Sequence, residues 1–130
     1  MELSDNNRCF GCGKLNPIGL QMTFSYDPDK GTSFANLTLP LHFQGWEGVA
    51  HGGIVTTILD EALAHAAFSQ NIPCVTGELT IRFKKPVPLE KELSVYGEIQ
   101  EIKGSLIYIT GYIKHNDILL AQAKGKMVRI

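Results

Sequence analysis

A histidine followed by two glycines, His51-Gly52-Gly53, directly precedes the one strongly apolar helical pattern in the chain. The first N–H groups of a helix have no partner inside the helix, and the helix dipole favours negative charge at that end. The Gly52 and Gly53 N–H groups could therefore hold a carbonyl oxygen and stabilise the oxyanion that develops during acyl transfer. The glycine pair taken alone favours a simpler interpretation, in which it only begins a buried helix.

Two adjacent carboxylates, Asp60 and Glu61, interrupt the apolar pattern of this helix. Each lies about 130° from the centre of the apolar face, on opposite flanks, so the periodicity does not choose between them. A half-buried carboxylate there could act as a general base or as a nucleophile, and the alternative is a pair of solvated helix charges. His65, one turn after Glu61, is interpreted as a core histidine.

Two cysteines near the start of the chain, Cys9 and Cys12, have the spacing of half a structural zinc site. Such a site needs four ligands, and the only other cysteine, Cys74, is isolated beyond the helix. The favoured interpretation is a packed loop with small, apolar thiols, and no metal is expected.

The basic residues Arg82, Lys84 and Lys85 form the one positive cluster. Alternation along a strand predicts that they share one strand face, where an ordinary solvated surface is favoured. The functional alternative is a grip on the phosphates of an anionic ligand such as coenzyme A.

These candidates must be positioned by one helix and several strands. The helical pattern begins after the glycines and should end near Asn71, before Pro73. Alternating or apolar runs predict six strands, over residues 22–26, 32–39, 75–84, 92–102, 106–114 and 118–129. One apolar helix among six strands must be covered by their sheet, because nothing else can bury its apolar face.

The composition limits the class of protein. The chain has 130 residues, 44% of them hydrophobic, with 12 Lys and Arg against 13 Asp and Glu. These values predict one compact domain and argue against nucleic-acid binding through bulk positive charge. Three cysteines fit a reducing compartment. No apolar run is long enough to span a membrane, and residues 1–7 are too polar for a secretory signal, so a cytoplasmic protein is expected.

The residues from Trp46 to Phe68, with Asp60 nine positions after His51, resemble the helix motif of hotdog-fold acyl-CoA thioesterases, above all the PaaI-like subgroup. Residues 75–86 are similar to the strand that follows this helix in the family. The resemblance covers about residues 19–130. It implies an α+β hotdog fold, in which a five- to six-stranded antiparallel sheet wraps one long central helix. Residues 1–19 would form an irregular segment with the Cys-x-x-Cys pair, and residues 20–130 the thioesterase domain.

The resemblance also implies a reaction, the hydrolysis of acyl-CoA to a free acid and coenzyme A without a cofactor. It assigns the catalytic carboxylate to Asp60, acting as general base or nucleophile from the partner subunit of a homodimer, with dimers often paired into tetramers. Thr76 would help to hold the attacking water, and His51 would orient the loop or touch the thioester. The thioester oxygen would bind the Gly52 N–H. Other candidate substrate contacts are Gly53, Gln44, Glu61, Arg82, Lys84 and Lys85.

One position departs from the family pattern. Several members carry Asn or Gln six residues before the histidine, where this chain has Gly45, and the adjacent Gln44 is the candidate to replace it. Two other functions remain as alternatives. One is a hotdog dehydratase or hydratase acting on acyl thioesters, for which Asp60 with His65 is a poor match. The other is a module that binds acyl-CoA without catalysis.

Overall fold

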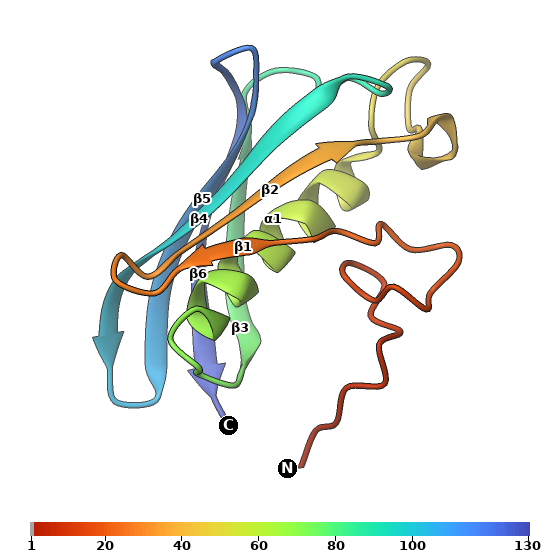
Figure 1. Cartoon of the computed structure of the whole chain (residues 1–130). Helices are drawn as coiled ribbons and strands as arrows, with labels where there is room; N and C mark the ends of the chain where they lie inside the picture. The colour runs from red at the N-terminus through yellow and green to blue at the C-terminus, as the bar shows by residue number, and fades with distance from the viewer. Residues whose placement is uncertain (1) are drawn as a thin grey trace.

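The computed structural model describes residues 2–130, which contain one long helix and six strands (Figure 1). The hairpin of β1 (Ser25–Asp27) and β2 (Thr32–Thr38) precedes a 3-10 turn, η1 (Leu41–Phe43), and the helix α1 (Gly52–Phe68). The remaining strands follow the helix as β3 (Cys74–Phe83), β4 (Glu92–Lys103), β5 (Leu106–His115) and β6 (Ile118–Arg129).

The strands form one antiparallel sheet in the order β1-β2-β4-β5-β6-β3, and α1 lies across one face of it (Figure 1). The helix contacts every strand from β2 to β6. This arrangement confirms the expected α+β hotdog class with six strands. The strand β3 is one edge of the sheet and pairs only with β6.

The core lies between α1 and the sheet, and strand alternation builds it. Along β5, Ile107, Ile109, Gly111 and Ile113 are buried, while Tyr108, Thr110 and Tyr112, which alternate with them, are partly exposed on the other face. From the helix, Leu59 and Leu63 are fully buried. Successive side chains of a strand point to opposite faces of the sheet, so this alternation places one face of β5 in the core.

Glycines let the helix approach the central strands closely. A Cβ on Gly97 of β4 would lie 2.3 Å from the Ala62 carbonyl oxygen, and one on Gly125 of β6 would lie 2.6 Å from the Leu63 side chain. Both distances are too short for real carbon contacts. Ser33 of β2 adds a buried hydrogen bond, because its hydroxyl donates to the Ala62 carbonyl at 2.7 Å. The middle of α1 is thus fixed against the sheet.

The predicted ends of two elements need correction. The helix ends at Phe68 and not near Asn71, which takes a left-handed conformation at φ 57°, typical of a residue just beyond a helix. The third strand ends at Phe83, because the N–H groups of Lys84 and Lys85 both donate to the Leu120 carbonyl and the regular pairing stops there.

The first strand is also shorter than predicted. It begins at Ser25, while Met22, expected to belong to it, precedes it and is buried in the core. Within residues 2–24 the structure has no helix or strand, yet this segment packs on the domain. The Leu20 and Met22 N–H groups donate to the carbonyls of Phe10 and Gly11. No helix in the described part of the chain is long and apolar enough to cross a membrane.

Candidate active site

The first turn of α1 leaves one backbone donor free. The imidazole Nδ1 of His51, the residue before the helix, accepts a hydrogen bond from the Gly53 N–H at 2.9 Å. The N–H groups of Ile54 and Val55 donate to the His51 carbonyl. Among the described residues, the Gly52 N–H is the one N–H in this turn that has no hydrogen-bond partner. An acceptor from outside the chain can therefore bind there, at the positive end of the helix dipole.

Gly52 opens onto two hollows in the surface. One has a volume of about 270 Å³, and the other about 430 Å³. A Cβ on Gly52 would come no closer than 3.8 Å to the Phe83 ring, so the glycine itself is not crowded. The first hollow is lined by Val49, Ala50, Gly52, Val55, Phe83, Lys84, Lys85, Pro86 and Val87, and the second by Gly45, Trp46, Ala50, His51 and Gly52.

Two aromatic residues beside these hollows, Trp46 and Phe83, are not among the site residues predicted from the sequence. Trp46 is 87% exposed and Phe83 is 55% exposed. Large apolar side chains this exposed mark contact surfaces for ligands or partners when they cluster. A lone aromatic in a loop or at a strand end carries no such signal in the sequence, because exposure is decided by the fold.

The basic cluster does not share one face. Arg82 lines a different hollow with Gln122 and Lys124, its neighbours across the outer face of the sheet. Lys84 and Lys85 lie beyond the end of β3 and line the hollow beside Gly52. The expectation of one strand face is therefore wrong, because the strand ends before the lysines. Lys84 and Lys85 remain near the helix terminus, and Arg82 does not.

Gln44 and Gly45 shape the loop that precedes the helix. The side-chain oxygen of Gln44 accepts a hydrogen bond from the Gly48 N–H at 2.9 Å and so closes the loop. A Cβ on Gly45 would lie 3.0 Å from the Cα of His51, so the loop packs tightly against the residue that begins the helix. The Gln44 side chain is therefore used within the loop, and the missing side chain at Gly45 leaves room for the His51 backbone.

Asp60 and Thr76 meet at the other end of the candidate site. The Thr76 hydroxyl donates to the Asp60 carboxylate, with 2.6 Å between Oγ1 and Oδ1. Asp60 is half-buried on the flank of α1 that faces β3. Burial, together with the charge of Asp60, raises the pKa of the neighbouring Cys74 thiol and keeps it protonated. A carboxylate held by a hydroxyl in this way can take a proton from water or attack a carbonyl carbon.

A β-bulge in β3 turns Thr76 toward Asp60. The pairing with β6 shifts register between Thr76 and Glu78, so Gly77 is an extra residue in the strand. Leu79 and Ile81, after the bulge, pack on the core. Strict alternation would place Thr76 on the opposite face from these two residues. The bulge reverses the alternation, as bulges beside functional sites often do.

Within one chain the two parts of the candidate site are far apart. Asp60 follows Gly52 by eight residues. At 1.5 Å rise per residue this separates them by about 12 Å along the helix axis. A carbonyl carbon bound at the Gly52 N–H therefore lies out of reach of the Asp60 of the same chain.

Glu61 lies on the opposite flank of the helix, as the periodicity predicts. Its carboxylate is 3.4 Å from the Cys9 sulfur and 3.4 Å from Nε2 of His65. Burial raises its pKa, but the neighbouring His65 ring and the Cys12 thiol stabilise the charged carboxylate, outweigh this effect and hold the pKa below its usual value. The structure thus separates Glu61 from Asp60 and Thr76 and places it under the N-terminal segment.

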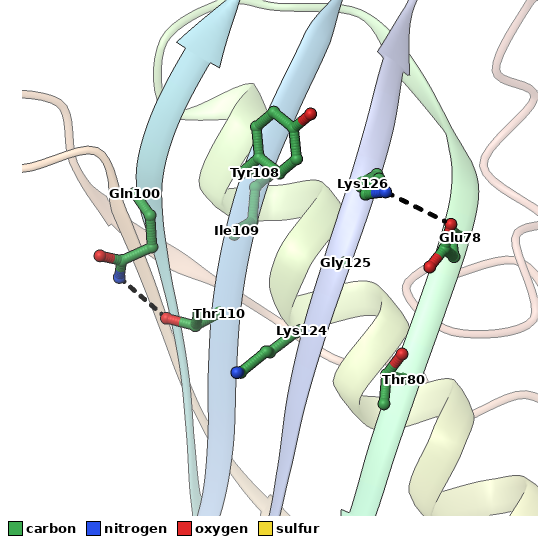
Figure 2. A pocket seen from close by; sticks show the side chains of 9 residues that line it. All are labelled: Glu78, Thr80, Gln100, Tyr108, Ile109, Thr110, Lys124, Gly125 and Lys126. Carbon is green, nitrogen blue, oxygen red and sulfur yellow. Dashed lines mark hydrogen bonds and ion pairs between the residues drawn. The ribbon is translucent and has the colours of Figure 1, made fainter.

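A further hollow, of about 330 Å³, lies on the outer face of the sheet, away from α1 (Figure 2). Figure 2 shows the Lys126 ammonium beside the Glu78 carboxylate, at 3.5 Å, and the Gln100 amide donating to the Thr110 hydroxyl, at 2.9 Å. These polar groups pair with one another. No predicted catalytic residue lines this hollow.

A family model, described as the thioesterase superfamily, matches residues 47–122. This stretch includes the loop before α1, the whole helix and most of the sheet. A curated relative, the acyl-coenzyme A thioesterase THEM4 of Rattus norvegicus, is 38% identical over 92 residues, which make up 69% of this chain and 40% of the relative. The chain thus spans well under half the length of that relative.

Solved structures share the fold. The thioesterase superfamily protein RHA08564 matches with a TM-score of 0.83 and 26% identity, over 89% of this chain and 57% of that one. The PaaI protein of E. coli, from the phenylacetic acid degradation operon, matches with a TM-score of 0.78 and 22% identity, over 85% and 80% of the two chains. The smu.793 protein of Streptococcus mutans, solved bound to acetyl CoA, matches with a TM-score of 0.78 and 20% identity, over 90% and 96%.

Proposed function

The chain belongs to the thioesterase superfamily, and on this premise we propose that it hydrolyses acyl-CoA thioesters to the free acid and coenzyme A. The observation that carries the proposal is the unpartnered Gly52 N–H, at the N-terminus of α1 and open to a hollow beside two lysines. The rat relative named as an acyl-coenzyme A thioesterase and the S. mutans protein bound to acetyl CoA support the choice of thioester.

In the proposed reaction the thioester oxygen accepts a hydrogen bond from the Gly52 N–H. As the carbonyl carbon becomes tetrahedral, this oxygen gains negative charge, and the donor at the helix terminus stabilises it. Gly53 contributes indirectly, because its N–H holds the His51 ring. His51 then keeps only Nε2 for contact with the thioester. Lys84 and Lys85 are proposed to bind the phosphates of coenzyme A.

Asp60 is the proposed base or nucleophile. As a base, its carboxylate takes a proton from water while the water oxygen attacks the carbonyl carbon. The carbon–sulfur bond then breaks, and the coenzyme A thiolate leaves and takes up a proton. As a nucleophile, Asp60 forms an anhydride that water hydrolyses. In both routes Thr76 orients the carboxylate through the 2.6 Å hydrogen bond. The carboxylate, hydroxyl and backbone donor suffice, so the reaction needs no cofactor.

We further propose that the working unit is a homodimer, which can pair into a tetramer. The separation of about 12 Å between Gly52 and Asp60 along one helix supports this, since the acid must then come from a second copy. The edge strand β3 supports it too. It is ten residues long, it is largely exposed and it carries Thr76. A second β3 can pair with it and bring the two helices side by side.

The test compares the wild-type chain with Asp60→Asn on short, long and aromatic acyl-CoAs, and follows the release of free thiol. Asparagine keeps an oxygen that can accept from Thr76 but cannot take a proton. The rate is expected to fall by about 100- to 10,000-fold, the usual contribution of a positioned base. Glu78→Gln is the matched control, because this carboxylate lies in β3 close to Thr76 in the chain but faces the outer side of the sheet, away from Asp60.

Three outcomes would contradict the proposal. A wild-type chain that cleaves no acyl-CoA but binds one saturably would be a binding module. A chain that hydrates an enoyl-CoA, seen as loss of the double-bond absorbance, would be a hydratase. An Asp60→Asn variant as fast as the wild type would remove Asp60 from the mechanism.

A further inference from the structure

Three potential metal ligands converge on the flank of α1 opposite Asp60. The sulfurs of Cys9 and Cys12 and a carboxylate oxygen of Glu61 all lie within 4.8 Å of one another. No part of the proposed hydrolysis uses these residues. The Cys-x-x-Cys motif offers only two potential ligands. The fold adds a third, Glu61, which lies 49 residues after Cys12 in the chain.

The distance between the Cys9 sulfur and the Glu61 carboxylate fits a tetrahedral zinc-type ion. Such an ion binds sulfur at about 2.3 Å and carboxylate oxygen at about 2.0 Å, which sets a sulfur and an oxygen ligand about 3.5 Å apart. The Cys9 sulfur and Oε1 of Glu61 are 3.4 Å apart. The two groups therefore stand at ligand distance without any movement of the helix.

The loop that carries the cysteines is shaped around the Glu61 carboxylate. A Cβ on Gly11 would lie 2.3 Å from Cδ of Glu61, so a side chain at this position would displace the carboxylate. The Gly11 N–H also donates to the Cys9 sulfur, at 3.3 Å. A Cβ on Gly13 would lie 2.3 Å from the Cys9 nitrogen. Gly11 therefore leaves room for the carboxylate, and Gly13 allows the close backbone packing of the cysteine loop.

A buried histidine points into the same cluster. His65 is nine-tenths buried, and its Nε2 has no hydrogen-bond partner among the described residues. This nitrogen lies 3.4 Å from Oε2 of Glu61, the oxygen that does not face Cys9. The other ring nitrogen, Nδ1, bonds the Tyr26 hydroxyl at 2.7 Å, and the ring stacks on Phe24. Ligating carboxylates are commonly oriented by such a second group.

We propose that Cys9, Cys12 and Glu61 bind a divalent cation of the zinc class, with His65 holding the second oxygen of Glu61 and water in the fourth position. Thiolate ligands select zinc-like ions over magnesium or calcium. Binding releases the two thiol protons to solvent, because thiolates are the ligands. The bound ion ties the N-terminal segment to α1, one residue away from Asp60.

Cobalt(II) binding to the reduced, metal-free wild-type chain tests the proposal. Co²⁺ in a tetrahedral site with two thiolates gives an intense sulfur-to-metal charge-transfer band, which water and carboxylate ligands do not give. We expect one Co²⁺ per chain, and Zn²⁺ should displace it with loss of the band. Cys9→Ser and Cys12→Ser should each remove most of the band, and Glu61→Gln should lower the affinity.

Two variants make the test specific. Cys74→Ser removes the third thiol, which lies in β3 away from the cluster, and should leave the Co²⁺ spectrum and affinity unchanged. His65→Gln should keep the thiolate band and lower the affinity by about 10- to 100-fold, the usual effect of losing a group that orients a ligand. Circular dichroism confirms that each variant folds.

The proposal is overturned if the reduced wild-type chain gives no thiolate band. It is also overturned if the band survives in both Cys9→Ser and Cys12→Ser, or disappears in Cys74→Ser. The first result needs only the wild-type chain, so it stands even where a variant fails to fold. None of these measurements uses acyl-CoA, and a chain without thioesterase activity tests the metal site equally well.

Discussion

Two neighbouring glycines have different roles in the first turn of α1. In the sequence Gly52 and Gly53 are equivalent candidates for an oxyanion donor. In the structure the Gly53 N–H is used by the His51 ring, and only the Gly52 N–H stays free. The sequence could not predict this difference, because it depends on which N–H the imidazole reaches. The structure reduces the candidate donors at this terminus from two to one.

Gly52→Pro tests this donor directly, because it replaces the N–H with the proline ring. Proline is favoured at the first position of a helix, where Gly52 stands. His51, at φ −59° and ψ 137°, already has the backbone conformation that a following proline requires. We expect thiol release to slow by about 100- to 1,000-fold, as for loss of one oxyanion donor. The measurement is kcat for acyl-CoA, with circular dichroism to check the helix.

Gly52→Ala is the matched variant. It keeps the N–H and adds a methyl group that meets only the Phe83 ring, at 3.8 Å. Its rate should therefore exceed that of Gly52→Pro by at least about tenfold, if the N–H is worth what such donors usually contribute. Equal rates for the two variants would mean that the added bulk matters and the Gly52 N–H does not.

The two adjacent carboxylates, Asp60 and Glu61, also show how far the sequence can predict the site at the residue scale. Periodicity places Asp60 and Glu61 on opposite flanks correctly, because the helical angle depends only on sequence separation. It does not show which flank meets β3 and which meets the cysteine loop. Those contacts come from segments 16 and 49 or more residues away in the chain. The family resemblance, and not the residue pattern, selected Asp60.

At the scale of the elements, the regular hydrophobic patterns predicted the architecture. They did not predict the β-bulge in β3 or the residue at which β3 ends. The number of strands and their order along the chain follow from alternation, and β5 keeps it from Leu106 to Lys114. The bulge at Gly77 breaks it and reverses the side to which Thr76 points. The end of β3 before Lys84 depends on the Leu120 carbonyl, which belongs to another strand. Local sequence carries little information about either feature.

Gly97→Ala tests how the helix is held against the sheet. The added methyl group would lie 2.3 Å from the Ala62 carbonyl oxygen and 2.8 Å from the Ser33 hydroxyl, so the helix or β4 must shift. We expect the free energy of unfolding to fall by about 1–3 kcal/mol, as for other overpacked sites. Urea denaturation measures this, and Gly52→Ala, whose methyl group makes only an ordinary contact with the Phe83 ring at 3.8 Å, should change stability by no more than about 0.5 kcal/mol. A Gly97→Ala variant as stable as the wild type would show that this close packing is not required.

At the scale of the whole molecule, the two groups proposed for catalysis lie at separate points along one helix. The free Gly52 N–H is at the N-terminus of α1, and Asp60 is more than two turns further along. The composition predicts a single compact domain, but it says nothing about how many such domains complete one site. The need for a second chain follows from the distance between Gly52 and Asp60 along the helix. The residue numbers give this distance only when residues 52–60 are known to be helical. The exposed edge of β3, beside Asp60, is where a second copy can supply the missing half.

Mixing two inactive variants distinguishes a shared site from a site within one chain. If each site combines the Gly52 of one subunit with the Asp60 of its partner, a dimer of one Gly52→Pro chain and one Asp60→Asn chain has one fully intact site and one doubly altered site. Random exchange of equal amounts makes half of the dimers mixed, so activity should recover to about a quarter of the wild-type value. The variants are unfolded together and refolded to allow exchange, and the separately refolded variants are the control. If Gly52 and Asp60 of the same chain served one site, every site would keep a defect and the mixture would stay as slow as its components.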